Sequence, residues 1–273
     1  MKKLLFVMMV MAAMVVSTAK ADNYQIKVGE FDELVVNDRV NVVYSSNPDS
    51  VGYVTFDIKP QFASYIIANR SKSKLKIELD PAAEPLKNLP TVYVYSSFLS
   101  KAENNKDSTL YIRDVRPGAK LSLQIQGNGK IVARNLDVVD MTLRLLTGKG
   151  TIIASGKCTT LTLDNVGAGE IQADEVEARD VKCRVMGTGT IGCAPTKTLS
   201  INGLGSGKVY YKGYPQITKG KLSNVKFEPL GDNSATEQKV TVTETDDAAM
   251  TECDDSQYTE EMPADNGRKP VVD

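Results

Sequence analysis

The sequence predicts an all-β protein built on a β-solenoid, with a β-rich region before it. A Gly-x-Gly-x-Ile or Gly-x-Gly-x-Val unit occurs five times between residues 121 and 215. The β-branched residues that close these units follow one another at steps of 21, 19, 20 and 18 residues. No helix-like stretch follows any unit. A repeat near twenty residues is too short for a helix pair or a propeller blade and matches one turn of a β-solenoid.

The N-terminal stretch is typical of a secretory signal peptide. Lys2 and Lys3 precede an apolar run from Leu4 to Val16, and Ala19-Lys20-Ala21 forms a small-x-small cleavage site. We therefore expect residues 1–21 to be removed on export, which would place the mature protein in the periplasm, on the cell surface or outside the cell. The apolar run is short for a membrane span and no comparable stretch follows it, so we expect no transmembrane segment after cleavage.

Residues 22–118 are expected to form a β-rich N-terminal part of the domain. Apolar and polar residues alternate in residues 40–44, 54–58 and 75–79, which favours strands with one buried face. A helical turn is expected between Pro60 and Ala68, because proline suits the first helical position. The spacing of 22 residues from Leu99 to Leu121 predicts a degenerate first coil, which would protect the open end of the stack.

Residues 119–230 are expected to hold the solenoid repeats and a C-terminal cap. Equivalent positions of successive repeats form four apolar columns that we expect to point inward, as stacked coils about 4.8 Å apart require. An extra residue at Leu145-Leu146-Thr147 predicts a β-bulge that keeps the columns in register. The columns are Leu121, Met141, Leu161, Val181 and Leu199; Leu123, Leu143, Leu163, Cys183 and Ile201; Ile131, Ile152, Ile171, Ile191 and Val209; and Ala133, Ala154, Ala173, Cys193 and Tyr211.

The glycines of the repeated units are expected to make tight structural corners. A phosphate-binding glycine loop occurs once, between a strand and a helix, whereas this motif recurs at every coil. Glycine suits such corners because it tolerates positive φ and a close approach of the backbone. The corner glycines are Gly127, Gly129, Gly148, Gly150, Gly167, Gly169, Gly187, Gly189, Gly205 and Gly207.

The C-terminal part differs from the repeats first in its bulky residues and then in its charge. Bulky aromatic residues and a proline in residues 209–215 (VYYKGYP) stand where a further coil would begin, which predicts the cap, and Val225 and Phe227 are expected in a last strand. Residues 22–230 carry 27 basic and 22 acidic residues, whereas residues 231–273 carry 3 basic and 12 acidic ones. Such an acidic segment, poor in large apolar residues, is expected to be a disordered tail.

Four cysteines and no histidine limit the chemistry that the chain can offer. Cys158, Cys183 and Cys193 stand at positions that hold apolar residues in neighbouring repeats, so we expect buried free thiols, with a bridge among them as the alternative. Cys253 lies alone in the acidic tail, and no pairing is predicted for it. The lack of histidine removes the commonest metal ligand and the side chain best suited to proton transfer near neutral pH.

Carboxylates in the repeats are the candidates for polysaccharide cleavage, which some β-helix enzymes perform. That chemistry needs two acids facing one cleft at roughly 5 to 10 Å. Glu175 and Glu177 alternate with apolar residues, which is typical of a solvated strand face, and we expect no catalytic cluster and no enzyme. The candidates are Asp137, Asp140, Asp164, Glu170, Asp174, Glu175, Glu177 and Asp180.

Metal and nucleic-acid sites are not expected either. A calcium-binding solenoid would repeat an aspartate at each corner, but the residue between the paired glycines varies among Asn128, Lys149, Ala168, Thr188 and Ser206. The lysines are scattered rather than arranged in a stripe, and the export signal argues against a nucleic-acid partner. No cofactor is predicted.

One aromatic group is a candidate ligand site. Tyr210, Lys212 and Tyr214 follow the last Gly-x-Gly unit and could stack on a sugar or contact a partner. The alternative is that these residues serve capping and interface packing.

With these features in place, the sequence resembles the family called putative auto-transporter adhesin, head GIN domain (DUF2807), common in Bacteroidetes. The resemblance covers roughly residues 28–217 and is carried by residues 31–36 (FDELVV), the serial Gly-x-Gly-x-Ile units and residues 209–215. It implies a right-handed parallel β-helix or solenoid and an exported, often surface-associated protein, with no established activity. The family's Gly-Ser-Gly-Asp corners have Lys, Thr or Glu here in place of Asp, so no acidic site is carried over.

These observations favour an exported, non-enzymatic β-solenoid that acts as an adhesin or as a binding module for cell-envelope or carbohydrate components. The expected partners are a glycan or an envelope or surface protein, and a homo-oligomer is an open possibility. The alternatives are a carbohydrate-active β-helix enzyme and a structural envelope protein that assembles with itself.

Overall fold

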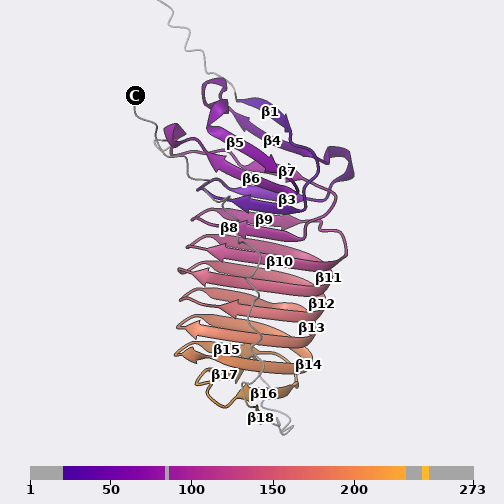
Figure 1. The fold of residues 1–273 in the computed structure, drawn as a ribbon, viewed down its shortest axis with the longest axis vertical. Helices are drawn as coiled ribbons and strands as arrows, with labels where there is room; N and C mark the ends of the chain where they lie inside the picture. Colours follow the sequence, from indigo (N-terminus) through magenta and orange to yellow (C-terminus); the bar gives the residue numbers. More distant parts are fainter. Residues whose placement is uncertain (1–20, 84–85, 232–241, 246–273) are drawn as a thin grey trace, which may run out of the picture.

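The computed structural model describes residues 21–83, 86–231 and 242–245. The predicted signal peptide lies outside these residues except for Ala21. Strands cross the molecule and stack along its long axis in rungs that follow the sequence below the N-terminal strands (Figure 1). The predicted all-β class and the solenoid are therefore confirmed.

Each coil contributes one rung to each of two sheets, which we call face 1 and face 2. Four long strands bend around the edge between the faces, so that their first half belongs to face 2 and their second half to face 1. These are β11 (Lys130–Thr147), β12 (Thr151–Asn165), β13 (Glu170–Gly187) and β14 (Thr190–Gly205).

The shorter strands complete the two parallel ladders on either side of the long ones. Face 1 adds β6 (Lys74–Leu79), β2 (Glu33–Val36), β8 (Lys101–Asn104) and β10 (Gly118–Gln126) before the long strands, and β16 (Gln216–Gly220) and β18 (Val242–Thr245) after them. Face 2 adds β7 (Val92–Tyr95), β3 (Val42–Ser45) and β9 (Thr109–Arg113) before, and β15 (Lys208–Tyr211) and β17 (Lys226–Pro229) after.

The N-terminal coils do not stack in sequence order. β2 pairs with both β6 and β8, and β3 pairs with both β7 and β9, so the first coil of the chain lies between two later ones. Antiparallel strands close this end: β1 (Asp22–Lys27) pairs with β4 (Tyr53–Ile58), β4 with β7, and β5 (Ile66–Ser71) with β6. Short 3₁₀ helices η1 (Pro48–Ser50), η2 (Pro60–Tyr65) and η3 (Pro81–Ala83) connect these strands, and η2 matches the predicted helical turn.

The interior of the solenoid consists of the four predicted columns. Each member has an exposed fraction of 5% or less. Successive members are backbone partners in neighbouring rungs, except Ala154 and Ala173, where the register shifts. The register shifts between Ile125 and Gln126, whose partners are Leu145 and Thr147, so Leu146 is the predicted bulge. Burial of each large aliphatic side chain contributes roughly 1.5 to 3 kcal/mol.

The Gly-x-Gly corners need glycine for two distinct reasons. Gly148 has a φ of +85°, and a Cβ there would lie 2.2 Å from the carbonyl oxygen of Gly127. Gly169 has no positive φ, but its Cβ would meet the carbonyl oxygen of Gly150 at 2.2 Å. Asn165 completes the corner from inside, since its amide nitrogen donates to the carbonyl oxygens of Gly169 (2.9 Å) and Thr190 (3.1 Å) in successive coils.

The C-terminal end differs from the prediction. Residues 209–215 were expected to be the cap, but β15 is a regular rung of face 2, and the next coil continues with β16 and β17. Tyr211 fits the inward column because Phe227 packs against it in the next rung, with ring centroids 6.4 Å apart. Within the predicted disordered tail, residues 242–245 form β18 on β16, because three of these four residues are β-branched and suit a strand. Residues 232–241 and 246–273 of the tail lie outside the described residues.

We expect Gly148→Ala to destabilise the protein by about 1–3 kcal/mol, because the new methyl group requires both a strained φ and movement of the neighbouring coil. The measurement is the free energy of unfolding from a guanidinium titration. Gly118→Ala is the matched control, since a Cβ at Gly118 meets its nearest atom at 3.8 Å and its φ is not positive. Equal stability of the two variants would contradict this account of the corners.

Candidate functional site

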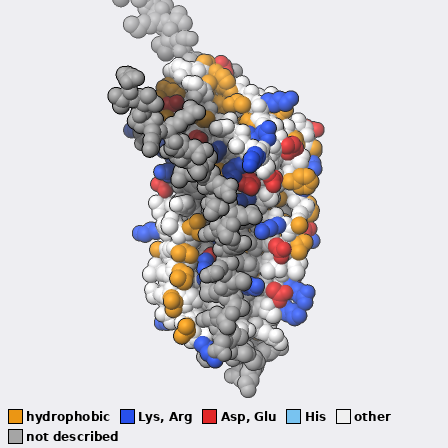
Figure 2. All heavy atoms as spheres, viewed as in Figure 1, with side chains coloured by type: hydrophobic (Ala, Val, Ile, Leu, Met, Phe, Trp, Pro, Cys, Tyr) orange, Lys and Arg blue, Asp and Glu red, His pale blue; other side chains and the backbone are white. Residues whose placement is uncertain are grey.

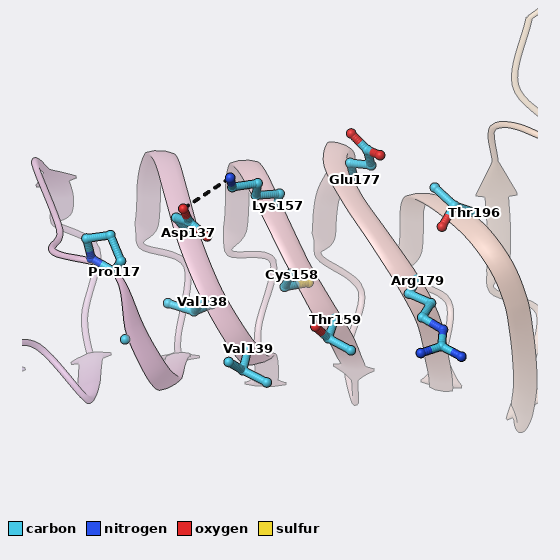
Figure 3. A pocket seen from close by; sticks show the side chains of 11 residues that line it. Pro117, Asp137, Val138, Val139, Lys157, Cys158, Thr159, Glu177, Arg179 and Thr196 are labelled. Carbon is cyan, nitrogen blue, oxygen red and sulfur yellow. Dashed lines mark ion pairs between the residues drawn. The ribbon is translucent and has the colours of Figure 1, made fainter.

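A groove crosses several coils at the edge opposite the glycine corners, and we call it the flank groove. It has a volume of about 530 Å³ and lies where the chain passes from face 2 to face 1. The side chains from successive coils point into it side by side (Figure 3). The lining includes Asp137, Val139, Lys157, Cys158, Thr159, Glu177, Arg179 and Thr196.

The coils are irregular at the edge that carries the groove. Gly156 is the backbone partner of Leu136 and Val176 in the coils on either side, and a Cβ at Gly156 would lie 2.1 Å from the carbonyl oxygen of Leu136, so only glycine fits between these coils. All the register shifts between β11, β12, β13 and β14 also occur at this edge. The coils therefore differ in shape at the flank and leave a groove between them.

The groove carries charges of alternating sign along the solenoid axis. Asp137, Lys157 and Glu177 are backbone partners in three successive coils, and Lys157 Nζ lies 3.2 Å from Asp137 Oδ2. Figure 3 shows these three on one side of the groove and Val139, Thr159 and Arg179 on the other. Neighbouring rungs are about 4.8 Å apart, so a ligand lying along the axis would meet a new charged or hydroxyl group at each step.

Cys158 lies between the two sides of the groove (Figure 3). It is half-buried and free, whereas the sequence predicted full burial, because Cys158 lines the flank groove. Burial, and next the negative charge of Asp140, raise the pKa of the Cys158 thiol to about 11. The thiol is therefore protonated near neutral pH and is a weak nucleophile. Cys183 and Cys193 are free and buried, as predicted.

The candidate carboxylates are spread over different surfaces. Asp164 is buried and forms a bidentate pair with Arg184, with Oδ1 2.8 Å from Nε and Oδ2 2.5 Å from Nη2. Asp174 pairs with Lys212 at 2.7 Å, and Asp180 accepts a 2.6 Å hydrogen bond from Thr198. The flank groove is lined by Asp137 and Glu177, which lie two rungs apart with Lys157 between them. Among the described residues, no three Cys, Asp or Glu side chains are placed to hold a metal ion.

The predicted aromatic site is only partly assembled. Tyr210 and Lys212 point outward on face 2, and Lys208 Nζ lies 5.9 Å from the Tyr210 ring centroid. Lys212 is held by Asp174 from a coil two rungs away, through both its carboxylate and its carbonyl oxygen. Tyr214 is 52% exposed in the turn after β15. The ligand role of this group stays a prediction.

A second feature, missed from the sequence, is an apolar edge made of Val166, Met186, Leu204 and Leu222. The backbone register places these residues beside the glycine corners of successive coils, and their exposed fractions rise from 36% to 77% along the row. Figure 2 shows hydrophobic side chains gathered along the lower left edge of the molecule, at the side where the strand arrows end in Figure 1. Met186, Leu204 and Leu222 line a hollow of about 250 Å³ there.

The fold and these surfaces define a stacked-coil β-solenoid that presents a groove and exposed faces on a rigid scaffold. The model of the family described as "Putative auto-transporter adhesin, head GIN domain" (DUF2807) matches residues 30–215, and the chain belongs to this family. The resemblance seen in the sequence is therefore confirmed. No helix among the described residues is long and apolar enough to cross a membrane.

Solved structures share this fold. A "putative adhesin" from Bacteroides fragilis NCTC 9343 is 19% identical, with a TM-score of 0.66 over 83% of this chain and 97% of that one. A "putative lipid binding protein" from Parabacteroides distasonis ATCC 8503 is 17% identical, with a TM-score of 0.59 over 84% and 98%. A "putative adhesin" from Parabacteroides merdae ATCC 43184 is 16% identical, with a TM-score of 0.56 over 84% and 97%. No curated protein matches the sequence.

We expect the alkylation rate of Cys158 by iodoacetamide to keep rising from about pH 7 to about pH 10, since the thiolate fraction grows tenfold per pH unit below the raised pKa. Peptide mapping by mass spectrometry separates Cys158 from the other cysteines. Asp140→Asn should increase the rate at a given pH, because the carboxylate of Asp140 raises the pKa, whereas Glu175→Gln should not. A rate that levels off below about pH 9 would be incompatible with this environment.

Proposed function

We propose that this protein is an exported, non-enzymatic binding module of the adhesin type, which holds an extended cell-envelope or carbohydrate polymer in the flank groove. The observation that carries the proposal is the groove itself, which crosses successive coils and offers a charged or hydroxyl group at each rung. A hydrogen-bonding polymer laid along the solenoid axis would meet this ladder repeatedly. The membership in an adhesin family supports a binding role.

The chemistry of the groove supports binding over catalysis. The Cys158 thiol has a raised pKa, and Lys157 forms an ion pair with Asp137 between the two carboxylates. Hydrolysis of a glycan needs one carboxyl group that donates a proton and another that acts as base or nucleophile. Asp137 is engaged by Lys157, and the other carboxylate of the groove lining, Glu177, lies two rungs away from it.

Simultaneous replacement of Lys157, Glu177 and Arg179 by Ala should weaken binding to envelope polysaccharide immobilised on a glycan array, by about tenfold for each charged hydrogen bond lost. The control is the pair Glu175→Ala and Lys197→Ala, which removes charges from the same region but not from the groove lining. Equal binding by the two proteins would exclude the groove as the binding site. Release of reducing ends from a glycan, lost in Glu177→Gln, would instead establish an enzyme.

The apolar edge favours a second candidate function, the binding of an apolar ligand such as an acyl chain. Besides its aliphatic side chains, the hollow there is lined by Asn202 and Ser223, whose Oδ1 and Oγ atoms are buried without a hydrogen-bond partner. These two atoms could take up the polar end of an amphiphile. A similar structure bears the name of a lipid-binding protein.

A dansyl-labelled fatty acid should therefore gain fluorescence on mixing with the protein. Leu204→Ser should reduce this gain severalfold, because it places a hydroxyl group in the apolar wall. Leu230→Ser is the matched control, since Leu230 is also exposed but lies outside the hollow. Equal fluorescence with both variants would rule out this edge as the lipid site.

A further inference from the structure

Face 2 carries an aromatic and basic surface near the N-terminal end, distinct from the flank groove and the apolar edge. We call it the tyrosine–arginine surface and define it by Tyr93, Tyr111, Arg113, Lys130 and Arg134. These residues belong to β7, β9 and β11, and all five side chains are exposed. No ligand role was expected for any of them from the sequence.

The tyrosines form one outward column. Val43 of β3 is the backbone partner of both Tyr93 and Tyr111, so the two tyrosines flank it on neighbouring rungs. Val43 is only 7% exposed although it points outward, whereas Tyr93 and Tyr111 are 40% and 38% exposed. Two rung spacings place the tyrosines about 9–10 Å apart on a flat sheet. Val132 continues the column as the partner of Tyr111. The result is an apolar stripe with hydroxyl groups at its surface.

Two arginines stand at the ends of neighbouring rungs, next to this stripe. Arg113 and Arg134 directly follow Ile112 and Ala133, which are backbone partners in neighbouring rungs. The Arg113 guanidinium lies 5.9 Å from the Tyr111 ring centroid. Like charges on adjacent rungs repel each other, so this pair destabilises the sheet unless an anion lies between them. Among the described residues, neither arginine forms an ion pair.

A comparison within face 2 shows that the fold can compensate such a pair. Lys208 and Lys226 are backbone partners in neighbouring rungs, and there Glu228 lies 3.3 Å from Lys208 Nζ. The carboxylate nearest to Arg113 in sequence is Asp114, whose Oδ2 accepts a 3.3 Å hydrogen bond from Ser45. On the other side of the stripe, Lys130 adds a third cation as the partner of Thr109. The tyrosine–arginine surface therefore has an excess of positive charge beside its aromatic rings.

We propose that the tyrosine–arginine surface binds an acidic polysaccharide, a glycan whose sugars carry carboxylate groups. The apolar face of a sugar ring can stack on a tyrosine, and its hydroxyl groups can reach the flanking threonine and tyrosine hydroxyls. A carboxylate accepts two parallel hydrogen bonds from a guanidinium, and it would relieve the repulsion between Arg113 and Arg134. This inference concerns another surface and does not depend on the flank groove.

The arrangement favours an acidic glycan over the two nearest alternatives. A neutral glycan would use the tyrosines but would leave the adjacent guanidiniums uncompensated. A single-stranded nucleic acid also stacks on aromatic rings beside cations, but it is bound in a basic groove that follows its backbone. The tyrosine–arginine surface is an open sheet face, and the cations lie on the two sides of a single stripe.

The test is isothermal titration of the chain, produced without residues 1–21, with polygalacturonate. We expect binding that weakens with added salt and that falls by about tenfold for each arginine removed in Arg113→Gln/Arg134→Gln. The matched control is Lys208→Gln/Lys226→Gln, which removes two cations from the same face and should keep its affinity. Tyr111→Leu should also bind more weakly, because an aliphatic side chain cannot offer a flat ring. Unchanged thermal unfolding of the variants shows that they are folded.

Several results would overturn the proposal. These are equal affinity for polygalacturonate and its neutral methyl ester, tighter binding of an oligothymidylate than of polygalacturonate, or equal losses in the arginine and lysine double variants. The absence of heat with polygalacturonate would overturn it too. The variant with Lys157, Glu177 and Arg179 replaced by Ala should bind polygalacturonate normally, so a failure of the flank groove and a failure of this surface are distinguishable.

Discussion

The parallel hydrogen-bond ladder between coils is the constraint on which this structure depends. Each rung must place its inward residue directly over that of the rung before, because a slip by one residue would turn the apolar side chains to water. The glycine corners enforce this register, since Gly148 and Gly169 leave no space for a Cβ against the preceding coil. The extra residue Leu146 is accommodated as a bulge just before the corner at Gly148, whereas the register shifts between the long strands occur at the opposite edge, where the flank groove lies.

The repeats made most of the central architecture predictable. The repeat period alone aligns the four columns, and the structure buries every member. One such column is Leu123, Leu143, Leu163, Cys183 and Ile201. The bulge at Leu146 was predictable as well, because a single extra residue between two aligned columns must be accommodated within the short segment that joins them. The prediction of a cap at residues 209–215 was wrong. It rested on bulky residues such as Tyr211, which suggested an end of the stack. The inward position of Tyr211 is possible because Phe227 supplies an aromatic partner in the next rung.

The candidate surfaces were much less predictable. Asp137, Lys157 and Glu177 are twenty residues apart, so the repeat period could have placed them in one column, but the groove beside them lies where the register shifts between the long strands occur, and the repeat does not reveal these shifts. The tyrosine–arginine surface depends on the order of the N-terminal coils. Val43 lies between Tyr93 and Tyr111 only because β3 is inserted between β7 and β9, and no periodic signal in the sequence reveals this insertion.

The same ladder that builds the core also determines what the surface can recognise. Every outward side chain has a neighbour about 4.8 Å away on the next rung, so the order of charges along a column affects both stability and binding. Opposite charges on successive rungs, as in Asp137 and Lys157, compensate each other and leave a mixed surface. Like charges that no carboxylate among the described residues neutralises, as in Arg113 and Arg134, leave a positive electrostatic potential that an external anion can neutralise. Because the scaffold is held by its inward columns, these outward columns can differ from coil to coil with little effect on the fold, and one regular solenoid can carry several unlike surfaces.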